Sequence, residues 1–276
     1  MIEQVLRHLR SPITGASPLH VDQTFDVERA PAVGLMTARL IGPSGQDPST
    51  VELGIWHAIG RDRAARTAAQ ITNVAPIVPE MYEAIWRCRS LGLLSGRAFT
   101  IAEEIAEMRA AIRDVDGGLV IDVGCSEGLY ARHLARDGAR VIAIDHSRAF
   151  LRRLLHRAAM SGVQVAAVRA LAQRLPVLDG HADAVVIGGS LNEIGDRAGA
   201  LSEAARVLRP GGRLFVMSLT KATSLAGRVA QTSVRASGVV FPSAETTIDE
   251  IEAVGLTVVD HRADRVVSRI TAARLP

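Results

Sequence analysis

From Gly118 to its C-terminal end, the chain alternates between continuous apolar runs and amphipathic runs. Continuous apolar runs are typical of strands that are buried on both faces of a parallel sheet. The amphipathic runs have apolar residues at helical spacing and stop at glycines such as Gly138 and Gly162. This order predicts a doubly wound α/β fold. The predicted strands are residues 118–124, 139–145, 163–170, 182–189, 213–219, 256–263 and 266–275, the last two as an edge hairpin.

The chain before residue 79 has a different composition. Stretches rich in Pro, Gly, Ser and Thr separate short apolar pieces, as expected for turns between short strands. Residues 1–78 are therefore predicted to form a small β-rich segment, and residues 79–276 to form the α/β domain. Within this domain, residues 80–114 and 221–241 are predicted to be lid helices, the second because it is too long for a simple connection.

The helix predicted over residues 101–112 has a clear apolar face. Ile105 and Met108 lie on that face, while Glu104 and Arg109 are predicted to face away from it. Acidic residues gather in its first turn, which suits the helix dipole.

Cysteine content and apolar runs restrict the environment of the protein. Cys88 and Cys125 are too few for a disulfide framework or a four-cysteine zinc site, which favours a reducing compartment. The start of the chain lacks the apolar run of a signal peptide, and no run reaches the roughly 18 apolar residues of a membrane span. A cytoplasmic protein without a membrane span is expected.

The formal net charge is +3, and almost all of the basic residues are arginine. These arginines recur singly or in pairs, as in Arg152 and Arg153, which favours a solvated surface over a nucleic-acid interface. Aromatic residues make up only 3% of the chain, so few side chains could stack on bases. An RNA partner is the weaker alternative.

A glycine-containing loop follows the first predicted strand of the α/β domain. In doubly wound sheets, ligands bind at the carboxyl ends of the strands. Gly124 allows a sharp turn there, and Gly128 opens a helix whose free N–H groups favour an anion. Ser126 stands where a dinucleotide-binding loop needs its middle glycine. Asp145, about 20 residues after the first glycine, is placed to hold ribose hydroxyls. The loop therefore favours a nucleoside with one carboxylate over a dinucleotide.

These motifs occur in a family order. VIDVGCSEG, AIDHS, RLPVLDGHADAVV, SLNEIGD and EAARVLRPGGRLFV together resemble class I S-adenosylmethionine-dependent methyltransferases, over roughly residues 80–276. The subgroup with the greatest similarity is the ubiquinone/menaquinone type, which acts on small molecules. The resemblance implies a Rossmann-like seven-stranded sheet and S-adenosylmethionine as cofactor. It implies cofactor contacts at Asp122, Gly124, Cys125, Ser126, Gly128, Tyr130, Asp145, His146, Leu171, Ala172, Gly188, Gly189 and Ser190.

Two departures from the family pattern concern the adenine and the acceptor. Leu171 stands where relatives commonly carry an aspartate for the adenine amino group. Leu191-Asn192-Glu193 stands where relatives often carry Leu-His-His, at a position that faces the substrate. The candidates for acceptor contact are Tyr82, Trp86, Arg89, Asn192 and Glu193. Glu193 and His146 are also the candidate bases for an oxygen or carbon acceptor.

The sequence predicts methyl transfer to a small, largely apolar acceptor, such as a secondary metabolite, a quinone or a lipid-like ring. An RNA base methyltransferase and a non-catalytic S-adenosylmethionine-binding protein remain alternatives. A homodimer is left open.

The N-terminal segment has a resemblance of its own. LRSPITGASPL, followed by GIWHAIG, resembles a zinc ribbon whose paired cysteines have been lost; Ser11 precedes Pro12 where relatives have cysteine. Structural zinc needs four good ligands, and His20 with His57 does not supply them. No metal is expected. The segment is interpreted either as a substrate or partner platform or as a remnant that packs on the α/β domain.

Overall fold

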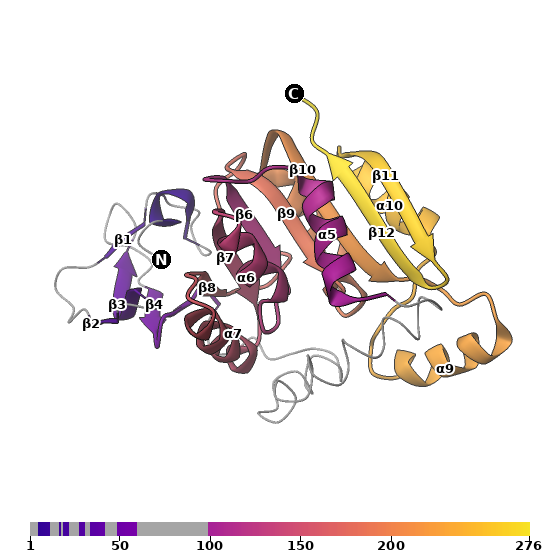
Figure 1. Cartoon of the computed structure of the whole chain (residues 1–276), viewed down its shortest axis with the longest axis horizontal. Helices are drawn as coiled ribbons and strands as arrows, with labels where there is room; N and C mark the ends of the chain where they lie inside the picture. Colours follow the sequence, from indigo (N-terminus) through magenta and orange to yellow (C-terminus); the bar gives the residue numbers. More distant parts are fainter. Residues whose placement is uncertain are drawn as a thin grey trace.

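The computed structural model of the 276-residue chain contains one large mixed sheet with helices on both faces (Figure 1). The structure describes residues 5–11, 17, 19–21, 28–30, 34–41, 49–59 and 99–276. The N-terminal elements are η1 (Leu6–His8), β1 (His20–Val21), β2 (Glu28–Ala30), β3 (Gly34–Ile41), β4 (Ser49–Glu52) and β5 (Ile55–His57). The remaining elements are α5 (Ile101–Ile112), β6 (Leu119–Val123), α6 (Leu129–Arg136), β7 (Arg140–Asp145), α7 (Arg148–Met160), β8 (Ala166–Arg169), β9 (Ala182–Gly188), η3 (Ser190–Asn192), α8 (Arg197–Val207), β10 (Leu208–Leu219), α9 (Leu225–Arg235), α10 (Ala244–Ala253), β11 (Thr257–Asp264) and β12 (Val267–Ala273).

Seven strands of the sheet follow the order β8-β7-β6-β9-β10-β12-β11. The pairs from β8 through β10 are parallel, whereas β12 is antiparallel to both β10 and β11. This arrangement confirms the predicted doubly wound sheet with a terminal hairpin. The chain moves outward from β6 to β8 and then returns to the other side of β6 as β9. The winding therefore reverses beside β6, which is where such sheets bind ligands at their carboxyl ends.

The N-terminal strands extend the same sheet. β5 pairs in parallel with β8, and β4, β3 and β1 follow outward in antiparallel order, with β2 also paired to β3. Trp56 on β5 is fully buried, and its indole N–H donates to Ser49 Oγ at 2.7 Å. The β-rich character of this region was predicted, but its direct pairing with β8 was not. The predicted boundary near residue 79 lies outside the described residues.

Helices cover the sheet on two faces and enclose two apolar cores. α5, α6 and α7 lie on one face, while α8 and α10 lie on the other (Figure 1). The first core joins Met108, Leu134 and Leu154 to the sheet. The second contains Leu201 and Ile251, together with Val5 and Leu9 of the N-terminal region. None of the helices formed by the described residues is long and apolar enough to cross a membrane.

One expectation for α5 was wrong. Glu104, predicted to face away from the core, is fully buried, and Tyr130 donates its hydroxyl hydrogen to Glu104 Oε1 at 2.7 Å. Arg109, by contrast, is partly exposed and pairs with Asp137 of the α6 C-terminus. Tyr130 brings its hydroxyl into the core from α6, and a buried polar group needs a hydrogen-bond partner. Glu104 supplies that partner, so α5 buries more than its apolar stripe.

Candidate cofactor site

The loop after β6 is built around backbone conformations that side chains rarely adopt. Gly124 has a φ of 67°, Ser126 48° and Gly128 74°. A Cβ atom on Gly124 would lie 2.3 Å from Ser190 Oγ, so both the dihedral angle and the available space require glycine. The N–H groups of Gly124 and Cys125 both donate to Ile144 O, at 2.8 and 3.1 Å. The loop is thereby fixed to the end of β7.

Asp145, the last residue of β7, is held by two backbone donors. Ser126 N donates to Asp145 Oδ2 at 3.0 Å, and Ser147 N donates to Asp145 Oδ1 at 2.8 Å. The side chain is almost fully buried, yet it lines the cleft described next. Because each carboxylate oxygen has capacity for a further hydrogen bond, the fixed carboxylate can accept bonds from ligand hydroxyls.

A cleft of about 570 Å³, including its open mouth, lies beside the glycine loop and the end of β7. Its walls come from the ends of β6, β7, β8 and β9 and from the segments that follow them. About half of the lining residues are apolar, and the carboxylates among them are Asp145 and Glu193. The lining residues are Gly124, Ser126, Ile144, Asp145, His146, Phe150, Ala170, Leu171, Ala172, Gln173, Ser190, Glu193 and Ile194.

Eight of the predicted cofactor or acceptor residues therefore meet at one cleft. They are Gly124, Ser126, Asp145, His146, Leu171, Ala172, Ser190 and Glu193. Sequence reasoning did not assign Ile144, Phe150, Ala170 or Ile194 to the site. These four are apolar residues, and an apolar residue in the sequence indicates burial and gives no signal of ligand contact.

Several other predicted residues support the loop without lining the cleft. Asp122 Oδ2 accepts from Ala131 N at 3.0 Å, so its side chain caps the first turn of α6. Tyr130 is buried, and its ring occupies the space that a Cβ atom on Gly188 would need. Cys125 is buried, and burial, reinforced by the nearby Asp145 and Asp122, raises the pKa of its thiol well above the usual value. This thiol is poorly suited to act as a nucleophile.

Asn192 was predicted to face the acceptor, but its side chain is committed to the protein backbone. Its Nδ2 donates to Leu219 O at 2.7 Å and to Val240 O at 2.6 Å, while Leu219 N donates to its Oδ1 at 2.8 Å. The residue is almost fully buried. Asn192 thus joins η3, the end of β10 and the segment after α9.

The two candidate bases, His146 and Glu193, both reach the cleft from segments that follow a strand. His146 Nδ1 lies 3.4 Å from Asp145 Oδ1, and its backbone carbonyl accepts from Arg169 Nε at 3.0 Å. Glu193 is partly exposed at the end of η3. The two residues thus border the cleft from different walls.

Tyr82, Trp86 and Arg89 lie outside the described residues, so their predicted acceptor contact stays a prediction. The second predicted lid contains the helix α9, which leaves Leu225 and Val229 largely exposed. In the N-terminal region, His57 Nε2 lies 3.7 Å from Glu52 Oε2. Within the described ranges, no group of three or more His, Cys, Asp or Glu side chains converges as a metal site. The zinc-ribbon resemblance stays a prediction.

Comparison with known proteins places this cleft in a family context. Residues 121–216 match the family described as "Methyltransferase domain". The chain is 34% identical over 148 residues to an uncharacterised chloroplastic methyltransferase of Arabidopsis thaliana, covering 50% of this chain and 40% of that protein. It is 37% identical over 129 residues to the demethylmenaquinone methyltransferase of Thermobifida fusca, covering 45% and 54%. The chain thus spans only about half, or less, of the length of these relatives.

Two solved structures show the same fold at low sequence identity. An S-adenosylmethionine-dependent methyltransferase from Aquifex aeolicus matches with a TM-score of 0.55 and 17% identity, covering 73% of this chain and 99% of that one. A [4+2]-cyclase matches with a TM-score of 0.57 and 21% identity, covering 77% and 98%. Since a fold can host different reactions, the chemistry has to be argued from the cleft.

Proposed function

We infer from the match of residues 121–216 to the methyltransferase domain family, and from the Rossmann-like fold, that the protein uses S-adenosylmethionine as cosubstrate. From this premise we propose that the protein transfers the methyl group of S-adenosylmethionine to a small, largely apolar acceptor. The observation that carries the proposal is the Asp145 carboxylate, fixed at the strand end beside the glycine loop and facing a cleft with apolar walls.

The residues present fit a nucleoside joined to an amino-acid chain. Asp145 supplies acceptors for ribose hydroxyls, and Ile144, Phe150 and Leu171 supply apolar surface for a base. A Cβ atom on Gly189 would meet nothing within 4 Å, so the backbone there leaves open space beside Ser190. A dinucleotide is less suited, because Ser126 replaces the glycine that allows close approach of a pyrophosphate.

The cofactor, when bound, supplies a sulfonium-activated methyl group. The protein's own work is alignment of the acceptor and exclusion of water. For an oxygen or carbon acceptor, Glu193 is the better candidate to take the acceptor's proton, since it lines the cleft from the segment after β9, away from the β7 end that carries Asp145 in the sequence. His146 borders the cofactor side, and its proximity to Asp145 favours a role in binding.

An apolar acceptor is supported by two observations. The cleft lining includes Ile194 beside Glu193, and α9 carries exposed apolar side chains. The Thermobifida fusca relative is a demethylmenaquinone methyltransferase, which places an apolar ring acceptor among the proteins similar to this chain. The departure from the family pattern at Glu193, which lines the cleft, favours an acceptor other than the relatives' own quinone.

Transfer of labelled methyl from S-adenosylmethionine to a panel of phenols, hydroquinones and prenylated rings tests this proposal. We expect one apolar class to be methylated, and Glu193→Gln to lower kcat for an oxygen acceptor without changing cofactor affinity. Methylation of RNA in preference to every small acceptor would contradict the proposed small-molecule acceptor and support the RNA alternative. Cofactor binding without any transfer would support the non-catalytic alternative.

A further inference from the structure

The wall of the cleft that faces the predicted adenine position belongs to the connection between β8 and β9. Residues 170–173 line the cleft, and residues 174–181 continue to the start of β9. Beyond a turn in which Arg174 N donates to Leu171 O at 3.0 Å, this connection has no helix or strand of its own. Its backbone groups need partners from elsewhere, and those partners set its position.

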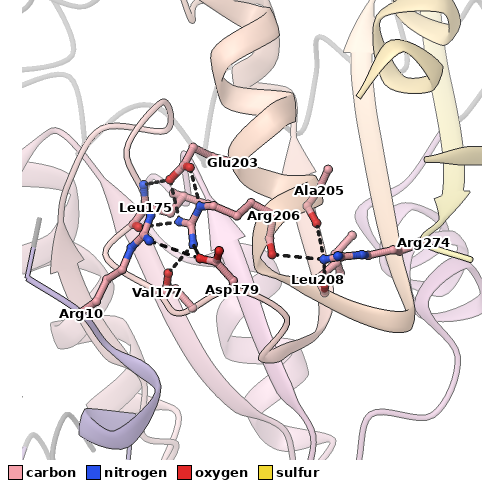
Figure 2. Close-up of polar contacts among 9 residues, drawn as sticks. All are labelled: Arg10, Leu175, Val177, Asp179, Glu203, Ala205, Arg206, Leu208 and Arg274. Carbon is pink, nitrogen blue, oxygen red and sulfur yellow. Dashed lines mark hydrogen bonds and ion pairs between the residues drawn. The ribbon is translucent and has the colours of Figure 1, made fainter. Parts of the chain in front are cut away.

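The side chain of Arg206, at the C-terminal end of α8, binds two of these backbone groups and one side chain of the connection (Figure 2). Its Nη2 donates to Leu175 O at 3.0 Å and its Nη1 to Val177 O at 2.8 Å and to Asp179 Oδ1. A bidentate pair with Glu203, at 2.6 and 2.7 Å, fixes the guanidinium itself. One guanidinium thus binds three residues of a connection that has no regular secondary structure to fix its position.

Glu203 adds a direct contact to the same connection. Its Oε2 accepts from Leu175 N at 2.7 Å, so both backbone groups of Leu175 are bound by α8 side chains. Only one residue, Arg174, separates Leu175 from Gln173 in the cleft wall. Any movement of Leu175 is therefore passed to the wall.

The N-terminal region holds the connection from its other side. Leu178 N donates to His8 O at 2.9 Å, and Arg10 N donates to Pro176 O at 3.2 Å. Arg10 Nη1 also reaches Asp179 Oδ1 at 3.2 Å, the oxygen that Arg206 binds (Figure 2). Residues 8–10 thus form a short backbone pairing with residues 176–178.

We propose that Arg206, with Glu203 and the N-terminal residues 8–10, positions the adenine wall of the cofactor cleft and so sets adenine recognition. This inference rests on the proposed cofactor. Preorganised walls bind more tightly because less conformational freedom is lost on binding. The N-terminal region thereby acquires a role at the cofactor site although it contributes no lining residue within the described ranges.

Arg274 offers a matched control on the same helix. Its Nη1 donates to Ala205 O, Arg206 O and Leu208 O at 2.6 to 3.3 Å, so it caps the end of α8 (Figure 2). One of these acceptors, Arg206 O, also accepts from Gly180 N at 2.9 Å, but no hydrogen bond or ion pair among the described residues joins the Arg274 side chain itself to residues 170–181. Arg274→Gln should loosen the same helix end without touching the adenine wall.

The experiment titrates the full chain with two ligands: S-adenosylhomocysteine, and its analogue with hypoxanthine in place of adenine. For Arg206→Gln we expect about tenfold weaker binding of S-adenosylhomocysteine and a smaller preference for adenine over hypoxanthine. Arg206→Lys, which keeps the charge but loses the bidentate fork, should fall between Arg206→Gln and the wild type. Arg274→Gln should lower the melting temperature and keep both affinities.

An unchanged adenine preference in Arg206→Gln, or equal losses in Arg206→Gln and Arg274→Gln, would overturn the proposal. Should Arg206→Gln fail to fold, Arg10→Gln answers the same question through the more exposed partner, with a loss of about twofold expected and an unchanged preference as the contrary result. Absence of binding by the wild-type chain would instead contradict the proposed function, so the two failures are distinguishable.

Discussion

Two walls of the same cleft are held in different ways. The glycine loop, residues 124–128, is fixed to Ile144 O and Asp145 at the end of the adjacent strand. The adenine wall, residues 170–173, depends on side chains of Arg206 and Glu203 at the far end of α8 and on the N-terminal region. The first wall is set by the motif itself and its neighbouring strand. The second keeps one bond to that strand, from Ala170 N to Asp145 O at 3.2 Å, and takes its other supports from more distant parts of the chain.

This difference predicts which substitutions would disturb each wall of the cleft. Substitutions within the glycine loop act on the site directly, through clashes and strained dihedral angles. The adenine wall can be perturbed by residues that never contact the ligand, because its own segment has no regular hydrogen-bond ladder to hold it.

The largest effect is expected for Gly124→Ala. The new Cβ would lie 2.3 Å from Ser190 Oγ at a positive φ, so the loop must shift or strain. We expect at least about 100-fold weaker binding of S-adenosylhomocysteine by calorimetry and a loss of about 2–4 kcal/mol in unfolding free energy. The double variant with Ser190→Gly removes the clashing atoms and should recover part of the binding. Binding within threefold of wild type in Gly124→Ala would show that the loop tolerates the clash.

Asp145→Asn should rank second. Removing the charge weakens hydrogen bonds to ribose hydroxyls, for which we expect a loss of about 1.5–3 kcal/mol, or roughly 10- to 100-fold in affinity. Asp183 is the matched control, because it also accepts a backbone N–H, from Leu119 at 2.7 Å, but lies at the start of β9. Asp183→Asn should lower the melting temperature and leave affinity unchanged. Equal affinities for both variants would show that Asp145 does not bind the ribose hydroxyls.

Asn192→Ala tests a residue that belongs to neither wall of the cleft. Losing three hydrogen bonds to Leu219 and Val240 should cost about 2–3 kcal/mol in unfolding free energy, measured by urea denaturation. We expect cofactor affinity to change less than threefold, because the side chain points into the protein. A large loss of acceptor turnover at unchanged stability would restore Asn192 as a substrate contact.

The smallest effect concerns the pH dependence of the N-terminal support. Burial, with Arg140, Arg7 and His181 nearby, lowers the pKa of His8 from 6.5 to about 4. Between these values the unfolded chain binds the proton more readily, so stability contributed by neutral His8 is present above pH 6.5 and is lost as pH falls towards 4.

His8→Gln should flatten the fall in unfolding free energy between pH 6.5 and 4 by about 1 kcal/mol, discounted because the ring is partly exposed to solvent. Denaturation series at several pH values measure this difference. The burial-lowered pKa values of His57 and His133 contribute with the same sign and remain in the variant as background. Parallel curves for wild type and variant would mean that His8 does not titrate in this window.

The sequence predicted the parts of the fold and site whose determinants are close together in the chain. The strand, glycine loop and Asp145 follow one another within one strand–helix–strand unit, and the alternation of apolar runs predicted the sheet. Phe150 and Ile194 were not predicted to line the cleft, because an apolar side chain that lines a cleft has the same sequence pattern as a core residue. The burial of Glu104 was not predicted, because its hydrogen-bond partner, Tyr130, comes from another helix.

The pairing of β5 with β8 and the contacts of Arg10 and Arg206 could not be predicted for a further reason. The pairing of Ile55 with Ala167 and the contact of Arg10 with Asp179 join residues 112 and 169 positions apart. Arg206 lies only 29 positions from Val177, but a single arginine in a basic chain gives no signal of which carbonyl groups it will meet. Such contacts become visible only when the chain is folded.

Hydrogen exchange of the full chain with and without S-adenosylhomocysteine observes both walls of the cleft in one measurement. We expect slower exchange on ligand binding in the peptide covering residues 124–131 and in the peptide covering residues 170–178. Protection of the glycine loop alone, or of neither peptide at ligand concentrations up to about 1 mM, would contradict a cleft in which the two walls hold one cofactor.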